Sequence, residues 1–147
     1  MEQQEWYEVK VKSESIAEDG LLKTKTENYL VDANSFAEAE QRVIESEYAP
    51  YNFPYEVKAC AIRKYQDIVR LSPGEADPNF FKCKVSLTML DEKSGKEKLS
   101  TINILIQSLD FVNAVIGLRD YLKKGFTDFV IESVQRTKIV KLIPYAA

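Results

Sequence analysis

A chain of 147 residues is long enough to bury about 70% of the surface it exposes when unfolded, so it can hold a core without disulfides or metals. Hydrophobic residues make up 45% and charged residues 29%, which excludes an intrinsically disordered chain. The net charge of −3 argues against general binding to duplex DNA or anionic membranes, although it is compatible with a local basic face. The polar N-terminus is not typical of a signal peptide, and no apolar run approaches the ~20 residues of a membrane span. We therefore expect a cytoplasmic protein that does not enter a membrane.

The first half of the chain predicts the order strand, turn, strand, helix, strand. Alternating apolar and polar residues mark the first strand, and Asp19-Gly20 supplies a turn. Ser35 and Glu38 form a Ser-x-x-Glu capping box, which predicts a helix that begins at Ser35 and buries an apolar stripe starting at Phe36. The expected strands cover residues 6–13, 23–33 and 55–69.

The second half predicts the same elements in the same order. Ser94-Gly95 is the expected turn, and Asp110 is the expected N-cap of a helix whose apolar stripe starts at Phe111. Gly125 is a plausible left-handed stop for this helix. The expected strands cover residues 79–90, 98–108 and 127–142.

The two halves can be aligned on each other as an internal repeat. WYEVKV at 6–11 matches FFKCKV at 80–85 with an offset of 74, and Gly20 matches Gly95 with an offset of 75. FPYEVKACAIR at 53–63 then matches FTDFVIESVQR at 126–136 with an offset of 73. We predict one compact α+β domain over 1–147, a tandem pseudo-symmetric pair of ββαβ units. Repeat unit one covers 5–70, a linker 71–79 and repeat unit two 80–145.

Within each unit we expect an antiparallel-rich sheet with one helix packed on one face. A right-handed crossover places the third strand beside the first, which predicts the strand order 2-1-3.

The sequence offers little for catalysis. It contains no histidine, so the commonest general base and the commonest metal ligand are both missing. No cysteine pair has zinc spacing, and no phosphate-binding glycine pattern occurs. Carboxylates are plentiful, but those on or near the first helix are typical of its solvated side. We therefore expect a protein that is not an enzyme, with no catalytic residue, metal or cofactor.

The two cysteines, Cys60 and Cys83, both fall in predicted strands. The favoured interpretation is that they are small buried hydrophobic residues. A disulfide or a redox role is the alternative.

Basic residues alternate with aromatic residues on several predicted strands. A strand face that carries lysines and a stacking aromatic is typical of sites for nucleotides or single-stranded nucleic acid. The alternative is that these lysines are the ordinary side chains of a solvated strand. The candidate ligand-binding residues are Trp6, Lys10, Lys12, Arg63, Tyr65, Phe80, Lys82, Lys84 and Arg136.

Two apolar clusters are candidates for a self-association interface. One follows the first helix and the other lies near the C-terminus. Core packing is the alternative for both. The candidate interface residues are Tyr48, Tyr51, Phe53, Ile139, Leu142 and Ile143.

Several longer segments also carry a family resemblance, the most specific being YLVDANSFAEAE at 29–40 and TMLDEKSGKEK at 88–98. The chain resembles an uncharacterised bacterial family, also present in phage and prophage genomes, which has only a domain-of-unknown-function label. The resemblance implies a small cytoplasmic protein with no assigned activity, and no catalytic residue comes with it.

The hypothesis from the sequence is a non-enzymatic binding or scaffolding protein that self-associates. The alternative is a protein that binds a nucleotide, an oligonucleotide or single-stranded nucleic acid. By analogy with the phage members of the family, that alternative includes sequestration of a signal molecule.

Overall fold

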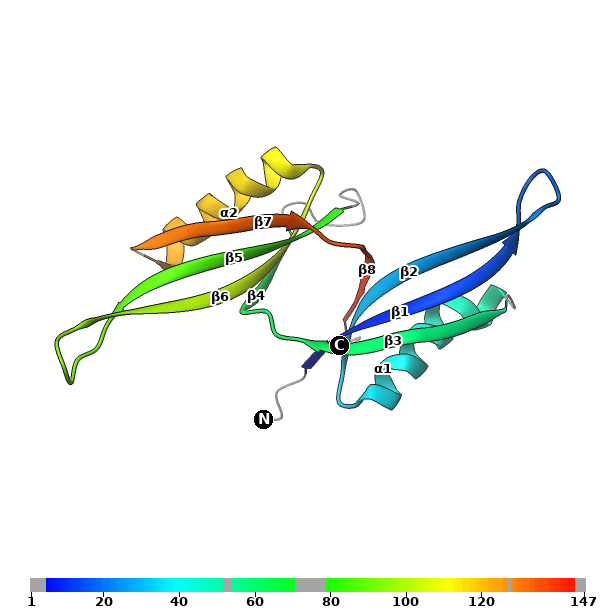
Figure 1. The fold of residues 1–147 in the computed structure, drawn as a ribbon, viewed down its shortest axis with the longest axis horizontal. Coiled ribbons are helices and arrows are strands. Elements are labelled where there is room, and N and C mark those ends of the chain that lie inside the picture. The colour runs from blue at the N-terminus through cyan, green and yellow to red at the C-terminus, as the bar shows by residue number, and fades with distance from the viewer. Residues whose placement is uncertain (1–4, 52–53, 71–78, 127, 145–147) are drawn as a thin grey trace. The chain divides into compact units, whose positions relative to one another are not determined.

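The computed structural model describes residues 5–51, 54–70, 79–126 and 128–144, with only the backbone described for Tyr51 and Met89. The chain forms two compact units: unit 1 contains Met1–Lys64 and Lys138–Ala147, and unit 2 contains Tyr65–Thr137. Each unit is a four-stranded sheet with one α-helix packed on one face (Figure 1). The predicted α+β fold built from two similar units is confirmed.

Unit 1 is built mainly from the first half of the chain. Its strand order is β3-β1-β2-β8, in which β2 and β3 run antiparallel to β1, and β8 runs parallel to β2. The α-helix continues directly into a π-helical turn and then a short 3-10 turn. The elements are β1 Glu5–Ile16, β2 Leu22–Ala33, α1 Phe36–Val43, η1 Ile44–Tyr48, η2 Ala49–Tyr51, β3 Tyr55–Arg63 and β8 Ile139–Ile143.

Unit 2 repeats this arrangement, with the strand order β4-β6-β5-β7. Here β6 and β7 run antiparallel to β5, and β4 runs parallel to β6. The predicted order 2-1-3 is therefore present in both sheets, each extended by a fourth strand. The elements are β4 Asp67–Arg70, β5 Asn79–Leu90, β6 Glu97–Ser108, α2 Phe111–Gly125 and β7 Phe129–Arg136.

The fourth strand of each sheet comes from the other repeat, which the sequence did not predict. The expected single strand at 55–69 is two strands: β3 pairs with β1 in unit 1, whereas β4 pairs with β6 in unit 2. The expected strand at 127–142 divides in the same way into β7 and β8. The packing units therefore differ in membership from the sequence repeats 5–70 and 80–145. Of the predicted linker, residues 71–78 lie outside the described residues, and Asn79 is the first residue of β5.

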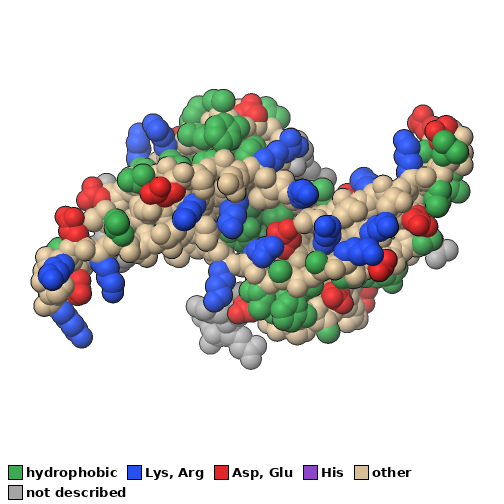
Figure 2. Space-filling view, in the orientation of Figure 1, with side chains coloured by type: hydrophobic (Ala, Val, Ile, Leu, Met, Phe, Trp, Pro, Cys, Tyr) green, Lys and Arg blue, Asp and Glu red, His purple; other side chains and the backbone are tan. Residues whose placement is uncertain are grey.

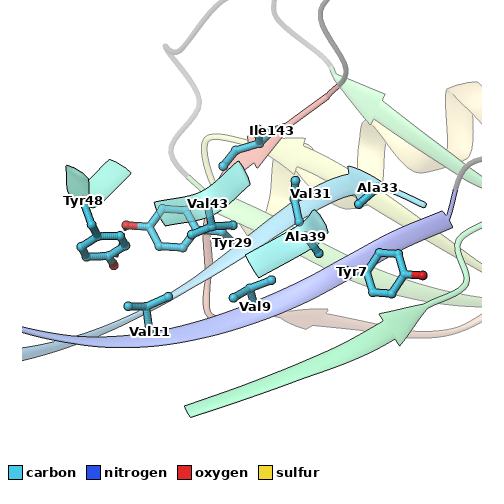
Figure 3. Packing of buried hydrophobic residues seen from close by; sticks show 10 residues of the cluster. All are labelled: Tyr7, Val9, Val11, Tyr29, Val31, Ala33, Ala39, Val43, Tyr48 and Ile143. Atoms are coloured by element: carbon cyan, nitrogen blue, oxygen red, sulfur yellow. Dashed lines mark hydrogen bonds between the residues drawn. The ribbon is translucent and has the colours of Figure 1, made fainter. Parts of the chain in front are cut away.

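The core of each unit lies between the helix and one face of its sheet. Figure 3 shows Val9 and Val11 of β1 and Val31 of β2 beside Ala39 and Val43 of α1. All five side chains are fully buried. The equivalent core of unit 2 consists of Phe81, Cys83, Val85, Leu87, Ile104, Ile106, Ala114, Leu118 and Leu122.

The two repeats carry a β-bulge at the same place, which corrects the alignment of their third strands. The register shifts between Lys10 and Val11 on β1, and between Lys84 and Val85 on β5. Across these bulges Ala59 pairs with Lys10 and Ser133 pairs with Lys84, an offset of 74 and not the predicted 73. Arg63 and Arg136 are therefore not structural equivalents.

Both predicted helix starts are confirmed. The Ser35 hydroxyl accepts a hydrogen bond from the backbone N–H of Glu38 at 3.1 Å, and the Asp110 carboxylate accepts one from Asn113 at 2.8 Å. Of the Glu38 carboxylate, Oε1 is buried without a hydrogen-bond partner among the described residues. Both turn glycines have positive φ, 82° at Gly20 and 69° at Gly95.

Three details of the predicted helices are wrong. Gly125 does not take a left-handed conformation; α2 ends there because Phe126 is extended, with φ −136° and ψ 140°. Phe36 and Phe111 are half-exposed, each at the first helical position. Each still makes an edge contact with a core ring, Tyr7 and Phe81 respectively.

Candidate functional site

In each sheet the helix covers one face, and alternate residues of the strands point to the other face, called here the helix-free face. On β1 this face carries Trp6, Glu8, Lys10 and Lys12, because Tyr7, Val9 and Val11 point to the helix. On β5 it carries Phe80, Lys82 and Lys84. Most of the predicted ligand-binding residues therefore lie on helix-free faces, but on those of two different units.

The helix-free face of unit 1 is balanced in charge. Glu8 is largely buried and accepts hydrogen bonds from Asn28 Nδ2 at 2.7 Å and from Arg63 Nε at 3.3 Å. The Arg63 guanidinium is therefore already paired with an acid of its own sheet. Lys10 and Lys12 follow Glu8 on the same face, and Trp6 lies half-buried at its end. An anionic ligand on this face would be attracted by two lysines and repelled by the neighbouring carboxylate of Glu8.

The helix-free face of unit 2 has a different balance. Lys82 pairs across the sheet with Leu105 and Gln135, and Lys84 pairs with Asn103 and Ser133, so the opposite side chains are neutral. Both lysines are exposed, and neither makes an ion pair with a carboxylate in the described part of the chain. This face therefore carries positive charge without a carboxylate directly opposite.

Phe80 does not provide the stacking surface that the sequence predicted. Its side chain is only 3% exposed, and its backbone oxygen accepts two hydrogen bonds from Thr137, from the backbone N–H and the hydroxyl, both at 2.8 Å. A base needs an accessible ring face to stack on, so Phe80 cannot fill that role in this conformation.

Arg136 and Tyr65 lie apart from the lysines of unit 2. Arg136 pairs with Phe81 and so points to the helix side of the sheet. Tyr65 is half-buried in the connection between β3 and β4. The structure therefore does not gather the nine predicted ligand-binding residues into one site.

The candidate interface residues that the structure describes belong to unit 1 and are mostly buried. Tyr48, Ile139 and Ile143 are buried, and Leu142 is half-buried. The burial of Tyr48, Ile139 and Ile143 agrees with the core alternative. Phe53 and the side chain of Tyr51 lie outside the described residues.

Tyr48 is held in place by a second tyrosine. The π-helical turn η1 ends at Tyr48, whose hydroxyl donates to the hydroxyl of Tyr29 at 3.1 Å, and Figure 3 shows the two rings side by side. Burial and this hydrogen bond raise the pKa of Tyr29, and burial raises the pKa of Tyr48. Both side chains therefore remain neutral at physiological pH and have a structural role.

The cysteines are free thiols, as the core interpretation predicted. Cys83 is fully buried, and burial raises its pKa to about 12. Cys60 is half-buried on β3, and burial raises its pKa to about 11. Because the thiolate is the reactive form, neither environment activates the sulfur at neutral pH.

A small open hollow lies beside the β1–β3 edge of unit 1. Its volume is about 180 Å³, and its lining includes the charged side chains of Lys12, Glu14 and Glu56. Ligand pockets for drug-sized molecules typically measure about 300–1,000 Å³ and are mostly apolar. The hollow is too small and too charged for a site of that kind.

Exposed hydrophobic side chains occur on α1, β3, β7 and β8, and groups of them lie on two other parts of the molecule. One part is the tips of the two hairpins, with Ile16, Leu21 and Leu22 in unit 1 and Leu90 and Leu99 in unit 2. The other is α2, over which Figure 2 shows a group of hydrophobic side chains. Both groups are surface features and not parts of a pocket.

Comparison with known proteins places the chain in a family. Residues 5–145 match the model of a family described as "Domain of unknown function (DUF4494)". The chain belongs to the DUF4494 family. No curated protein and no solved structure matches it.

The family assignment agrees with the resemblance to a domain of unknown function, whereas the bacterial and phage origin stays a prediction. In the described residues of this DUF4494 chain, no helix has the length and apolar character required to span a bilayer. The same residues contain no group of three or more cysteine, aspartate or glutamate side chains arranged to hold a metal ion.

Sequence reasoning missed two features of this DUF4494 site. One is the role of Glu8 as the hydrogen-bond acceptor for Asn28 and Arg63. The sequence did contain a sign of this role, because the acidic Glu8 stands among the lysines that occupy alternate positions of the first strand. The other is the exposed side of α2, although the four-residue spacing of Val112 and Ile116 indicates two apolar residues on one side of a helix.

Proposed function

We propose that this chain is a non-enzymatic scaffolding protein that holds partner proteins on its two hairpins and associates with itself. The observation that carries the proposal is that both hairpins extend beyond their neighbouring strands and end in exposed aliphatic residues. In unit 1, β3 reaches only to Ser13 of β1 and β8 only to Asn28 of β2. In unit 2, β7 reaches only to Leu87 of β5 and β4 only to Ile104 of β6.

Each hairpin therefore has an outer part, called here an arm, formed by residues 14–24 in unit 1 and 88–99 in unit 2. A two-stranded hairpin without a third strand or a packed face is marginally stable in water. The arms nevertheless carry leucine and isoleucine at exposed positions, and Ile16 lies opposite Leu22 in the register. Exposed aliphatic residues at the end of a long hairpin are typical of a surface that a partner covers.

In the experiment, three forms of the chain are made in its own host and chemically cross-linked to their neighbours. The proteins that co-purify with each form are then compared. The forms are wild type, the arm variant Leu22→Ser with Leu99→Ser, and the control Lys23→Ser with Lys98→Ser. The control changes neighbouring residues of the same arms. We expect quantitative mass spectrometry to find a partner that wild type and control retain and the arm variant loses.

Two results contradict the scaffold proposal. One is an identical set of cross-linked proteins for the arm variant and the wild type. The other is turnover of any substrate by the purified chain, because the proposal assigns it no catalytic role.

A second candidate function is binding of a nucleotide, an oligonucleotide or single-stranded nucleic acid. It is supported by the helix-free face of unit 2, where Lys82 and Lys84 face neutral residues and Arg70 lies opposite Gln107. A strand face with unpaired cations attracts phosphate groups. Sequestration of a nucleotide signal would use the same chemistry.

The test of this candidate is fluorescence anisotropy with a labelled single-stranded oligonucleotide. We expect binding that weakens as salt rises and is lost in Lys82→Glu with Lys84→Glu, whereas the control Lys10→Glu with Lys12→Glu in unit 1 retains most of it. Equal loss in both variants, or no binding by wild type at low salt, contradicts an anion site on unit 2.

A further inference from the structure

Three exposed aliphatic residues lie on the outer side of α2 or just before the helix begins. Leu109 is 56% exposed, Val112 63% and Ile116 54%. The spacing of four residues places Val112 and Ile116 on one side of the helix, opposite the buried Ala114, Leu118 and Leu122, and Leu109 comes directly before the N-cap residue Asp110. We call the three residues the α2 stripe.

The other repeat shows that the fold does not require this stripe. At an offset of 75, the structural equivalents of Leu109, Val112 and Ile116 are Asn34, Ala37 and Gln41. Unit 1 thus packs a shorter α-helix on the same kind of sheet with polar or small residues at these positions. Valine and isoleucine are also weaker helix formers than alanine and glutamine. The apolar residues of the α2 stripe therefore point to a contact outside the core of unit 2.

The distribution of residues along α2 is suited to pairing with another α2 in the antiparallel direction. Val112 and Ile116 lie two residues before and two residues after Ala114, so a twofold axis at Ala114 places Val112 of one copy against Ile116 of the other.

The charges at the two ends of the stripe complement each other in that arrangement. Asp110 lies at one end and Arg119 at the other, both exposed, and Arg119 makes no ion pair with a described residue. Antiparallel pairing places Arg119 of each copy near Asp110 of the other, whereas parallel pairing places like charges together. Opposed helix dipoles favour the antiparallel direction as well.

We propose that the α2 stripe is a homodimer interface, in which α2 of one copy packs antiparallel against α2 of a second copy. The inference rests on the self-association part of the proposed function and names its surface. It does not depend on the arms, so the test of the arms and the test of the stripe can fail independently.

The test is sedimentation velocity over a concentration series up to about 100 µM, a range that detects a micromolar dimer. We expect wild type to dimerise, and Val112→Glu and Ile116→Glu each to raise the dissociation constant about tenfold or more. The matched control is Val130→Glu, the same change at an exposed valine of β7. It leaves the dissociation constant unchanged. Circular dichroism checks that each variant folds.

The antiparallel direction has a test of its own. Chains with Cys60→Ala carry either Val112→Cys or Ile116→Cys, and the two are mixed under oxidising conditions. We expect the mixed disulfide between position 112 and position 116 to exceed both symmetric disulfides. Predominance of the symmetric disulfides contradicts the antiparallel pair. Two results overturn the proposal. One is a chain that stays monomeric over the whole concentration series, which would leave the stripe to another protein. The other is a dimer that keeps its dissociation constant after both glutamate substitutions, which would mean that the chain dimerises through another surface.

Discussion

At the scale of single residues, Tyr121 shows how a side chain connects the helix of unit 2 to a strand from the other repeat. Its hydroxyl donates a 2.7 Å hydrogen bond to the carboxylate of Asp67, the first residue of β4. Burial, followed by this hydrogen bond and the charge of Asp67, raises the pKa of Tyr121 to about 12 from an ordinary value of 10.0. Tyr121 is therefore more strongly protonated in the folded chain than in the unfolded chain.

This shift predicts that Tyr121→Phe alters the alkaline pH dependence of stability. The stabilising effect of the raised pKa is fully present below pH 10 and is lost as the pH rises through about 12. We expect the free energy of unfolding of wild type to fall more steeply than that of Tyr121→Phe in this window. Urea unfolding of both proteins at several pH values between 9 and 12 measures this difference in slope. Parallel curves for the two proteins would show that Tyr121 does not contribute to the alkaline loss.

At the scale of elements, the helix starts follow from local sequence and the helix surfaces do not. Ser35 and Asp110 cap their helices because a short oxygen-bearing side chain satisfies a backbone N–H that has no partner inside the helix. The half-exposure of Phe36 and Phe111 depends instead on how each helix rests on its sheet, which local spacing does not encode.

The caps predict the effect of single substitutions on stability. Ser35→Ala and Asp110→Ala each remove one hydrogen bond to a backbone N–H, at a cost of about 1 kcal/mol in the free energy of unfolding. Ser35→Thr and Asp110→Asn keep an accepting oxygen and serve as controls that retain most of the stability. Chemical denaturation of the four variants measures the difference. Equal losses in alanine variants and controls would mean that the caps contribute nothing.

At the scale of the whole molecule, the exchange of fourth strands decides which residues stabilise which unit. Ile143 follows β7 of unit 2 in the chain, yet it is buried in the core of unit 1 through β8. Val69 follows β3 of unit 1, yet it packs against the core of unit 2 through β4. Neighbours in sequence therefore support different cores.

This arrangement predicts crossed effects for two matched substitutions. Ile143→Asp places a charge in the core of unit 1 and should speed amide hydrogen exchange in β1 and β2. Val69→Asp should instead speed exchange in β5 and β6. Hydrogen exchange with mass spectrometry separates the two patterns. If Ile143→Asp loosened unit 2 and Val69→Asp loosened unit 1, the strands would not be exchanged.

The sequence by itself determined the local features: the alternating strands, the turns at Gly20 and Gly95, the caps at Ser35 and Asp110, and the repeat itself. These depend on interactions within a few residues, or on a pattern repeated along the chain. The strand exchange, the burial of Phe80 and the neutralisation of Arg63 by Glu8 were decided only by the tertiary structure. Each depends on which strand lies beside which, and the periodicity of a strand is the same whichever sheet it joins.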